Sequence, residues 1–167
     1  YKGIAKVLLD GYEVSGITRY QSGRFWTITG NATTGGNRRA DYLGGDLYLK
    51  DDRQWLNNTQ ITVPDPCSTT GGTLLIKGSF GVAPCSRRGT SGVGIVEGPD
   101  LVAWDLSIRK RIRFNETMNL RLQADVFNAF NRANFSTLST NVSAADFGRL
   151  TASGPGRSIQ LGVRFGF

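Results

Sequence analysis

The feature that most constrains the fold is a faultless two-residue alternation over residues 158–167. Apolar side chains alternate there with polar residues or glycine, and the apolar set is Ile159, Leu161, Val163, Phe165 and Phe167. A period of two is typical of a β-strand whose two faces meet different surroundings. A strand with one wholly apolar face is therefore predicted over about 157–167.

Two segments upstream show the same alternation. In the strand expected over about 118–130, an apolar face opposes a face that carries Arg121, Gln123 and Asp125. In the strand expected over about 101–114, the polar face carries Arg109, Arg111 and Arg113, and Lys110 interrupts the apolar face. Only Asn115 and Glu116 lie between the flanking residues Phe114 and Thr117, which predicts a tight antiparallel hairpin. The second strand of this hairpin is expected to pair with 157–167.

A less regular strand is expected over about 12–29, where Ile17 breaks the alternation. The Asp10-Gly11 step before it is a strong turn signal. An apolar strand over about 1–8 precedes that turn, which brings the expected total to about five strands. Because the sequence starts inside such a strand, we expect the chain to be a segment of a longer polypeptide.

The connections between these strands alternate between short and long. Tight turns lie near Asp10 and Asn115, and long loops are expected over about 30–99 and 131–156. Structureless loops of this length are unusual in compact soluble domains. Short turns on one side and long loops on the other are typical of outer-membrane barrels. The pattern predicts an all-β fold: the last strands of a larger antiparallel transmembrane β-barrel, with long external loops.

Composition restricts the chemistry that the chain can perform. Lys and Arg total 20, Asp and Glu total 13, and histidine is absent, so the formal net charge is +7. Histidine-based acid–base catalysis and histidine-ligated metal sites are therefore excluded. No catalytic constellation, cofactor motif or metal site is expected, and the chain is not predicted to be an enzyme.

The two cysteines, Cys67 and Cys85, lie in sequence rich in Gly, Ser, Thr and Pro. Neither their spacing nor their neighbours indicate a metal site. In an oxidising compartment they form a possible disulfide, and two separate thiols are the alternative.

The basic run over 107–113 raises the question of nucleic-acid binding, because clustered cations attract phosphates. The alternation argues against it, since Arg109, Arg111 and Arg113 share one face while Ile108 and Ile112 share the other. A water-lined lumen accounts for the arginines better, and no nucleic-acid partner is expected.

Several motifs recur here in the order of a known family. They are Gly11-Tyr-Glu-Val-Ser-Gly-Ile, Gln21-Ser-Gly, Gly98-Pro-Asp with Trp104-Asp-Leu-Ser, Phe127-Asn-Ala-Phe-Asn-Arg-Ala-Asn-Phe135, Phe147-Gly-Arg, and Arg157 to Phe167. In this order they resemble the last strands of TonB-dependent outer-membrane transporters. The likeness is to the Oar-like subgroup, which carries a carboxypeptidase-regulatory-like domain at its N-terminus.

The resemblance implies a bacterial outer-membrane location and several partners. These are the lipid bilayer, the remainder of the barrel and its plug, and the insertion machinery, which would read the strand that ends on Phe167. Contact with TonB is expected only through N-terminal parts that this chain does not contain. Members of the family usually carry an apolar or aromatic residue where Arg109 stands and a neutral polar one where Arg111 stands. The lumenal face of this strand is therefore expected to be unusually basic.

The predicted function is outer-membrane transport of an unidentified substrate, with this chain forming part of the barrel wall. A soluble extracellular all-β binding module is the alternative, and it would bury the apolar face of residues 158–167 against a second sheet. Arg121 and Asp125 are expected to join one polar network. The residues predicted to face the lumen are Arg109, Arg111, Arg113, Arg121, Gln123, Asp125, Gln160 and Arg164.

Overall fold

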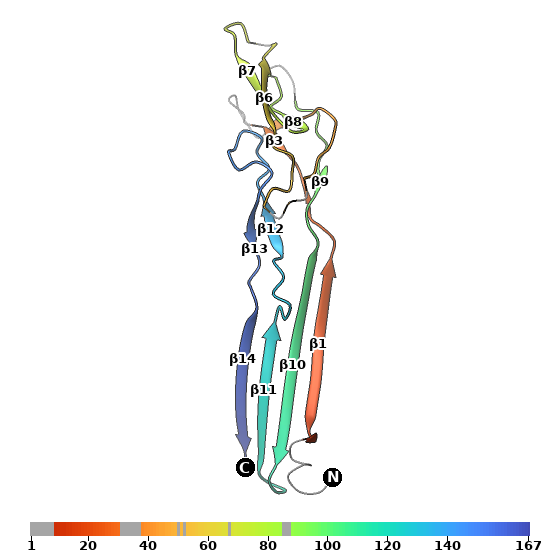
Figure 1. Cartoon of the computed structure of the whole chain (residues 1–167), viewed down its shortest axis with the longest axis vertical. Coiled ribbons are helices and arrows are strands. Elements are labelled where there is room, and N and C mark those ends of the chain that lie inside the picture. The colour runs from red at the N-terminus through yellow and green to blue at the C-terminus, as the bar shows by residue number, and fades with distance from the viewer. Residues whose placement is uncertain (1–8, 31–37, 50, 52, 67, 85–87) are drawn as a thin grey trace. The chain divides into compact units, whose positions relative to one another are not determined.

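The computed structural model describes residues 9–30, 38–49, 51, 53–66, 68–84 and 88–167 (Figure 1). The strand expected over about 1–8 lies outside the described residues. The fold is all-β with antiparallel sheets, as the sequence predicted. In the described part of the chain, no helix is both long and apolar enough to cross a membrane.

The chain divides into two compact units. The first, which we call the sheet unit, comprises Tyr1–Gln21, Leu101–Asn134 and Gly154–Phe167. The second, the loop unit, comprises Ser22–Asp100 and Phe135–Ser153. Each unit is thus assembled from segments that are far apart in the sequence.

The sheet unit contains one four-stranded antiparallel sheet in the order β1-β10-β11-β14 (Figure 1). The strands are β1 (Tyr12–Gln21), β10 (Leu101–Arg113), β11 (Asn119–Phe127) and β14 (Ser158–Gly166). The register runs without irregularity through all three pairings. The predicted hairpin and the pairing of its second strand with 157–167 are confirmed. Among the described strands the sheet does not close, and β1 and β14 form its edges.

The turn between β10 and β11 is one residue longer than predicted. The amide of Phe114 donates to the carbonyl of Met118 at 3.0 Å, so three residues, Asn115 to Thr117, make the connection. The side-chain oxygen of Asn115 accepts from the amides of Thr117 and Met118 at 3.1 and 2.6 Å. An Asn side chain thus takes over hydrogen bonds that a two-residue turn would make with its backbone.

The strand predicted over 12–29 is wrong beyond Gln21, because the chain leaves the sheet there. Within the loop unit, the amide of Gly23 donates to the carboxylate of Asp100 at 3.1 Å. A Cβ atom at Gly23 would lie 1.9 Å from the carbonyl oxygen of Gly98, so only glycine permits this approach. The close packing of these two chain segments ends the strand.

The strand predicted over 118–130 also ends early, at Phe127. Asn128 and Asn131 adopt left-handed φ angles of 48° and 51°, which a β-strand cannot contain. The amide of Asn128 donates to Asp105 at 2.9 Å, and its side-chain oxygen accepts from the amide of Arg132 at 3.1 Å. These hydrogen bonds stabilise a compact turn directly after β11.

The two long connections are not the structureless loops that the sequence predicted, because they fold together as the loop unit. Short antiparallel strands pair β2 with β9, β3 with β4 and β12 with β13, and another sheet has the order β5-β8-β7-β6. These strands are β2 (Phe25–Trp26), β3 (Thr29–Gly30), β4 (Arg38–Arg39), β5 (Asp41–Tyr42), β6 (Gln60–Pro64), β7 (Thr73–Lys77), β8 (Phe80–Gly81), β9 (Val96–Glu97), β12 (Phe135–Leu138) and β13 (Leu150–Ser153).

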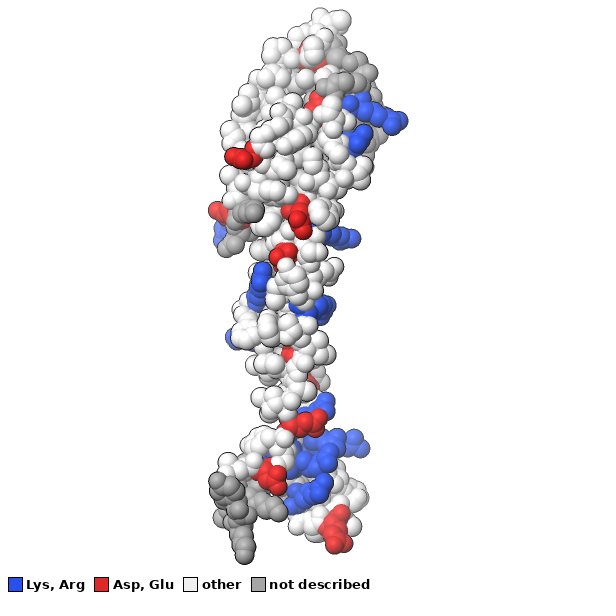
Figure 2. Space-filling model, turned by 90° about the vertical axis from the view of Figure 1, so that its right-hand side faces the viewer, with Lys and Arg blue, Asp and Glu red and all other residues white. Residues whose placement is uncertain are grey.

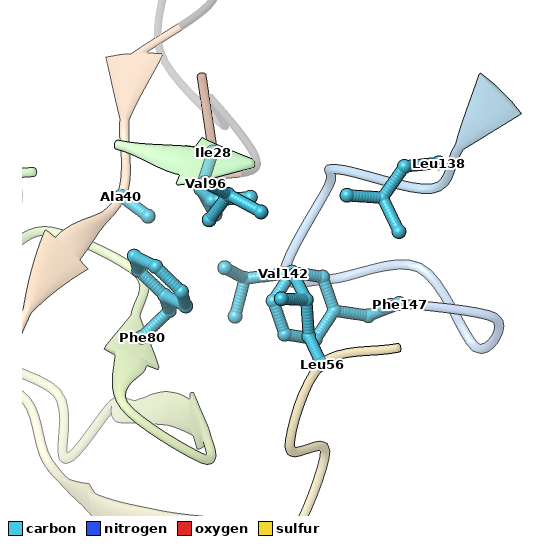
Figure 3. Packing of buried hydrophobic residues seen from close by; sticks show 8 residues of the cluster. All are labelled: Ile28, Ala40, Leu56, Phe80, Val96, Leu138, Val142 and Phe147. Carbon is cyan, nitrogen blue, oxygen red and sulfur yellow. The ribbon is translucent and has the colours of Figure 1, made fainter. Parts of the chain in front are cut away.

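A single hydrophobic core holds the loop unit together (Figure 3). The rings of Phe80 and Phe147 pack edge to face with centroids 6.2 Å apart, although 66 residues separate them in the sequence. Lys77 is buried, and its ammonium group donates to the carbonyl of Ala144 at 2.6 Å. The buried core residues are Ile28, Ala40, Leu56, Phe80, Val96, Leu138, Val142 and Phe147.

Shortening Phe147 to alanine is expected to open the loop unit. Removal of a fully buried phenylalanine costs about 3–5 kcal/mol, because it leaves a cavity as well as lost apolar contacts. Trypsin should then cleave the full-length protein faster after Lys77, which the native unit buries. Mass spectrometry of the fragments over time measures the rate. Val93→Ala, at a residue 80% exposed in the same unit, serves as the control. Equal rates for the two variants would contradict a core shared by both segments.

Replacing Asn115 with leucine is expected to lower the free energy of unfolding by about 1 kcal/mol, because the turn loses its side-chain acceptor. Asn115→Asp keeps an acceptor oxygen in that place, and its free energy of unfolding should stay close to that of the wild type. Urea unfolding of the full-length protein measures both variants. A leucine variant as stable as the aspartate variant would show that the turn does not need these hydrogen bonds.

Candidate functional site

One face of the four-stranded sheet is polar over most of its length, and we call it the polar face. The register places all eight residues of the predicted lumenal set on it: Arg109, Arg111, Arg113, Arg121, Gln123, Asp125, Gln160 and Arg164. Glu13, Ser15 and Arg19 of β1 extend this face across the fourth strand. Ile17 is its apolar exception on β1 and lies opposite Asp105.

The register also arranges these side chains in rows that run across the strands. One row from the β10–β11 turn end of the sheet, Arg111 lies opposite Arg121, and Arg121 lies opposite Arg164. We call these three residues the arginine row. Side chains directly opposite each other have Cβ atoms about 4.5–5.5 Å apart, where like charges destabilise a sheet. The row therefore places three positive charges side by side.

Asp125 occupies a different row and has neutral partners. Its carboxylate accepts from the hydroxyl of Ser107 at 2.6 Å and from the side-chain amide of Gln123 at 2.7 Å. The expected network between Arg121 and Asp125 is wrong, because residues four apart in a strand lie about 13 Å from each other. Asp125 therefore does not neutralise the arginine row.

Arg109 stands between these two rows and makes the ion pair of the site. Its guanidinium lies 3.6 Å from the carboxylate of Glu13, its neighbour on β1. Both side chains are well exposed, so the pair contributes about 0–1 kcal/mol. The Nε atom of Arg109 is buried and has no hydrogen-bond partner among the described residues. Arg109 thus keeps an unused donor beside the arginine row.

The turn-side end of the sheet is strongly basic, and Figure 2 shows Lys and Arg side chains gathered in the lower part of the view. Two open cavities of about 640 and 680 Å³ lie there. Arg111, Arg113 and Arg121 line both of them. Among the described residues, neither these three arginines nor Arg164 has an ion pair. Asp10 and Glu13 line the first cavity and Glu116 lines the second, but none of them forms an ion pair with these four arginines among the described residues.

The opposite face of the sheet, the apolar face, is as uniform as the polar one. Its aliphatic side chains are exposed on β1, β10 and β14, for example Val14 at 69%, Ile108 at 44% and Leu161 at 77%, and are half-buried on β11. Lys110 is the charged exception, and its ammonium group lies 3.8 Å from the ring centroid of Tyr12. An exposed apolar surface of this extent marks a face that meets something other than water.

Aromatic residues lie at both ends of the apolar face, and aliphatic residues lie between them. Tyr12 and Phe165 stand near the turn end, while Tyr20 and Trp104 stand near the other end. Trp104 also packs edge to face against Phe130, with ring centroids 5.6 Å apart. Aromatic girdles on both sides of an apolar band are the pattern of membrane β-barrels.

The residues predicted as an insertion signal fall in and directly after β14. Ile159, Leu161, Val163 and Phe165 lie on the apolar face, opposite apolar or small residues of β11. Phe167 follows the strand, is 96% exposed, and has its ring centroid 6.3 Å from that of Phe165. The possible disulfide between Cys67 and Cys85 lies outside the described residues.

Sequence reasoning did not find the arginine row, because alternation assigns residues to a face but not to a row. The turn at Asn115 was predicted, but the turn at Asn128 was missed, although Asn is a common turn residue and offers that signal. Within the described part of the chain, no three His, Cys, Asp or Glu residues group in a way that could hold a metal ion.

Comparison with known protein families matches residues 2–160 with the family described as Outer membrane beta barrel domain. No curated protein and no solved structure matches the chain. The family match covers nearly the whole sequence and agrees with the two-faced antiparallel sheet. The chain therefore belongs to the outer membrane beta barrel domain family, and its place is the bacterial outer membrane.

Proposed function

We propose that this chain forms part of the barrel wall of a TonB-dependent outer-membrane transporter. The observation that carries the proposal is the sheet itself, in which one long face is apolar and exposed while the other is polar and basic. In a barrel wall the apolar face meets lipid and the polar face lines a water-filled lumen. All eight predicted residues, from Arg109 to Arg164, then face the lumen.

The lengths of the strands support a membrane-spanning role. β1, β10, β11 and β14 have 10, 13, 9 and 9 residues. A tilted strand crosses the hydrocarbon core with about 9–11 residues, whereas strands of soluble proteins most often have about 5–6. The four strands are therefore long enough to reach from one membrane interface to the other.

The edges of the sheet support the presence of further barrel strands. A membrane offers no water to exposed backbone amides and carbonyls, so spanning strands must belong to a closed barrel. Among the described strands, β1 and β14 have one partner each. The remainder of the barrel is the partner that would complete both edges.

The TonB-dependent part of the proposal rests on the ordered motifs, from Gly11-Tyr-Glu-Val to the strand that ends at Phe167. The plug and the segment that contacts TonB would belong to N-terminal parts of such a transporter. The basic polar face is suited to guiding solutes through the lumen, and no catalytic role is proposed for it. The outer-membrane family leaves little support for the alternative of a soluble binding module.

A pair of labelled cysteines tests the assignment of the two faces. Leu161→Cys and Gln160→Cys place a fluorophore on the apolar and polar faces of the same strand, in full-length protein whose Cys67 and Cys85 are replaced by serine. In lipid vesicles, brominated lipid is expected to quench the label at 161 strongly, because that face meets acyl chains. A water-soluble quencher is expected to act on the label at 160. Steady-state fluorescence measures both effects.

The result that would contradict the proposal is a label at 161 that brominated lipid leaves unaffected. A β-sandwich would give that result, because its apolar face is buried against a second sheet. Stronger quenching by brominated lipid at 160 than at 161 would show that the assignment of the two faces must be reversed.

Substitutions at Phe167 and at the arginines are expected to separate assembly from uptake. Phe167→Asp should block assembly, although a charge near a membrane interface costs only about 0–1 kcal/mol in a barrel. That cost is too small to unfold a large barrel, so failure would point to lost recognition by the insertion machinery. Replacing Arg109, Arg111 and Arg113 together with glutamine should spare assembly and reduce uptake of anionic solutes, because it removes positive potential.

Heat-modifiable gel mobility reports assembly in cells, and uptake of candidate ligands is measured beside it. Phe167→Leu is the matched control, since it keeps an apolar side chain at the same place. Normal assembly of the aspartate variant, together with collapse of the triple glutamine variant, would overturn the assignment of both faces.

A further inference from the structure

The arginines of the arginine row repel one another. Arg111 lies opposite Arg121 and Arg121 lies opposite Arg164, so both cross-strand pairs in the row join like charges. Glu13, an acidic side chain on the polar face of β1, pairs with Arg109 instead. Like charges directly opposite each other destabilise a sheet. An anion bound at the row would therefore relieve the repulsion.

Space for such an anion is present beside the row. The two cavities, of about 640 and 680 Å³, share Arg111, Arg113 and Arg121 in their walls, whereas Arg164 lines neither of them and joins the site through its position opposite Arg121. These volumes fall within the range of about 300–1,000 Å³ that small-molecule sites occupy. Next to Arg164, the polar face of β14 carries only Gly162 and Gly166, so no side chain of that strand crowds its guanidinium.

The donors at the row match an anion with several oxygens. Each guanidinium presents a planar fork of N–H groups that binds phosphate or carboxylate through two parallel hydrogen bonds. A single carboxylate has two oxygens and one negative charge, which leaves most of these donors unpaired. A phosphoryl group supplies three oxygens and up to two negative charges, and so balances two facing arginines better.

We propose that Arg111, Arg121 and Arg164 form a binding site for the phosphoryl group of a small soluble solute. The inference deepens the proposed function, because it rests on the polar face lining the lumen and names phosphorylated compounds as the substrate class. Arg111 and Arg121 hold the phosphoryl oxygens from neighbouring strands. Arg109 and Arg113, above and below the row, add positive potential that attracts the solute.

The test measures stabilisation of the purified full-length protein by inorganic phosphate in detergent. The thermal midpoint of unfolding is followed as sodium phosphate replaces sodium chloride at constant ionic strength. Saturable stabilisation is expected, because a ligand that binds only the folded state raises its stability. Arg121→Gln should weaken the apparent affinity by about tenfold or more, since it removes charge-assisted hydrogen bonds. The apparent affinity of Arg121→Lys for phosphate should lie between those of the wild type and Arg121→Gln, because lysine keeps the charge but not the planar fork of N–H groups.

A second readout separates a binding role from a merely structural one. At low salt and without phosphate, Arg121→Gln should raise the thermal midpoint above that of the wild type, because it relieves the repulsion within the row. Arg19→Gln is the matched control, on the same face of β1 but opposite Ala103 and outside the row. It should respond to phosphate as the wild type does.

Three outcomes would overturn the inference. They are an unchanged midpoint when phosphate replaces chloride, an equal loss of response in the Arg19 and Arg121 variants, and stabilisation by vesicles of anionic phospholipid but not by inorganic phosphate. The last would assign the arginines to lipid headgroups. The fluorescence pattern at residues 160 and 161 is measured separately. Failure of the fluorescence test would contradict the assignment of the polar face to a lumen. Failure of phosphate binding would contradict only the proposed substrate class.

Discussion

If one strand of the sheet shifted by one residue against its neighbour, its two faces would be exchanged, because side chains alternate with a period of two. Such a shift in β11 would carry Arg121 to the apolar face and Leu122 to the polar one. The cost of misplacing these side chains makes the observed register strongly preferred. Backbone hydrogen bonds hold the strands together, but the contrast between the two faces determines which hydrogen bonds form.

The same register creates the repulsion within the arginine row. Arg111, Arg121 and Arg164 are acceptable on the polar face one by one, since each can reach water. Placed opposite one another, they raise the local positive potential and favour anions. Asp125 does not relieve this potential, because Ser107 and Gln123 hold its carboxylate in another row. A feature that weakens the sheet is therefore the one that makes it suited to binding.

The loop unit depends on a different interaction, the burial of apolar side chains from two distant segments. Phe147 and Val142 from one connection pack with Phe80 and Leu56 from the other. Neither segment alone carries the whole core, so the two connections are expected to unfold together. Their short strands would be marginal by themselves, because isolated two-stranded pairs have little stability in water.

The alternation at 158–167 and in the segments upstream was sufficient to predict four strands, their two faces and the hairpin, because these depend on local periodicity. Strand ends were predicted less well. β1 ends at Gln21, shortly before Gly23 donates to Asp100, and β11 ends at Phe127, just before the left-handed Asn128; such features leave no periodic signal. The folded loop unit was missed for a related reason, since its core residues are scattered among turn-forming residues. The sequence by itself determined which side chains share a face. Only the tertiary structure decided which of them stand opposite one another, because register depends on the pairing of strands that are far apart in the chain.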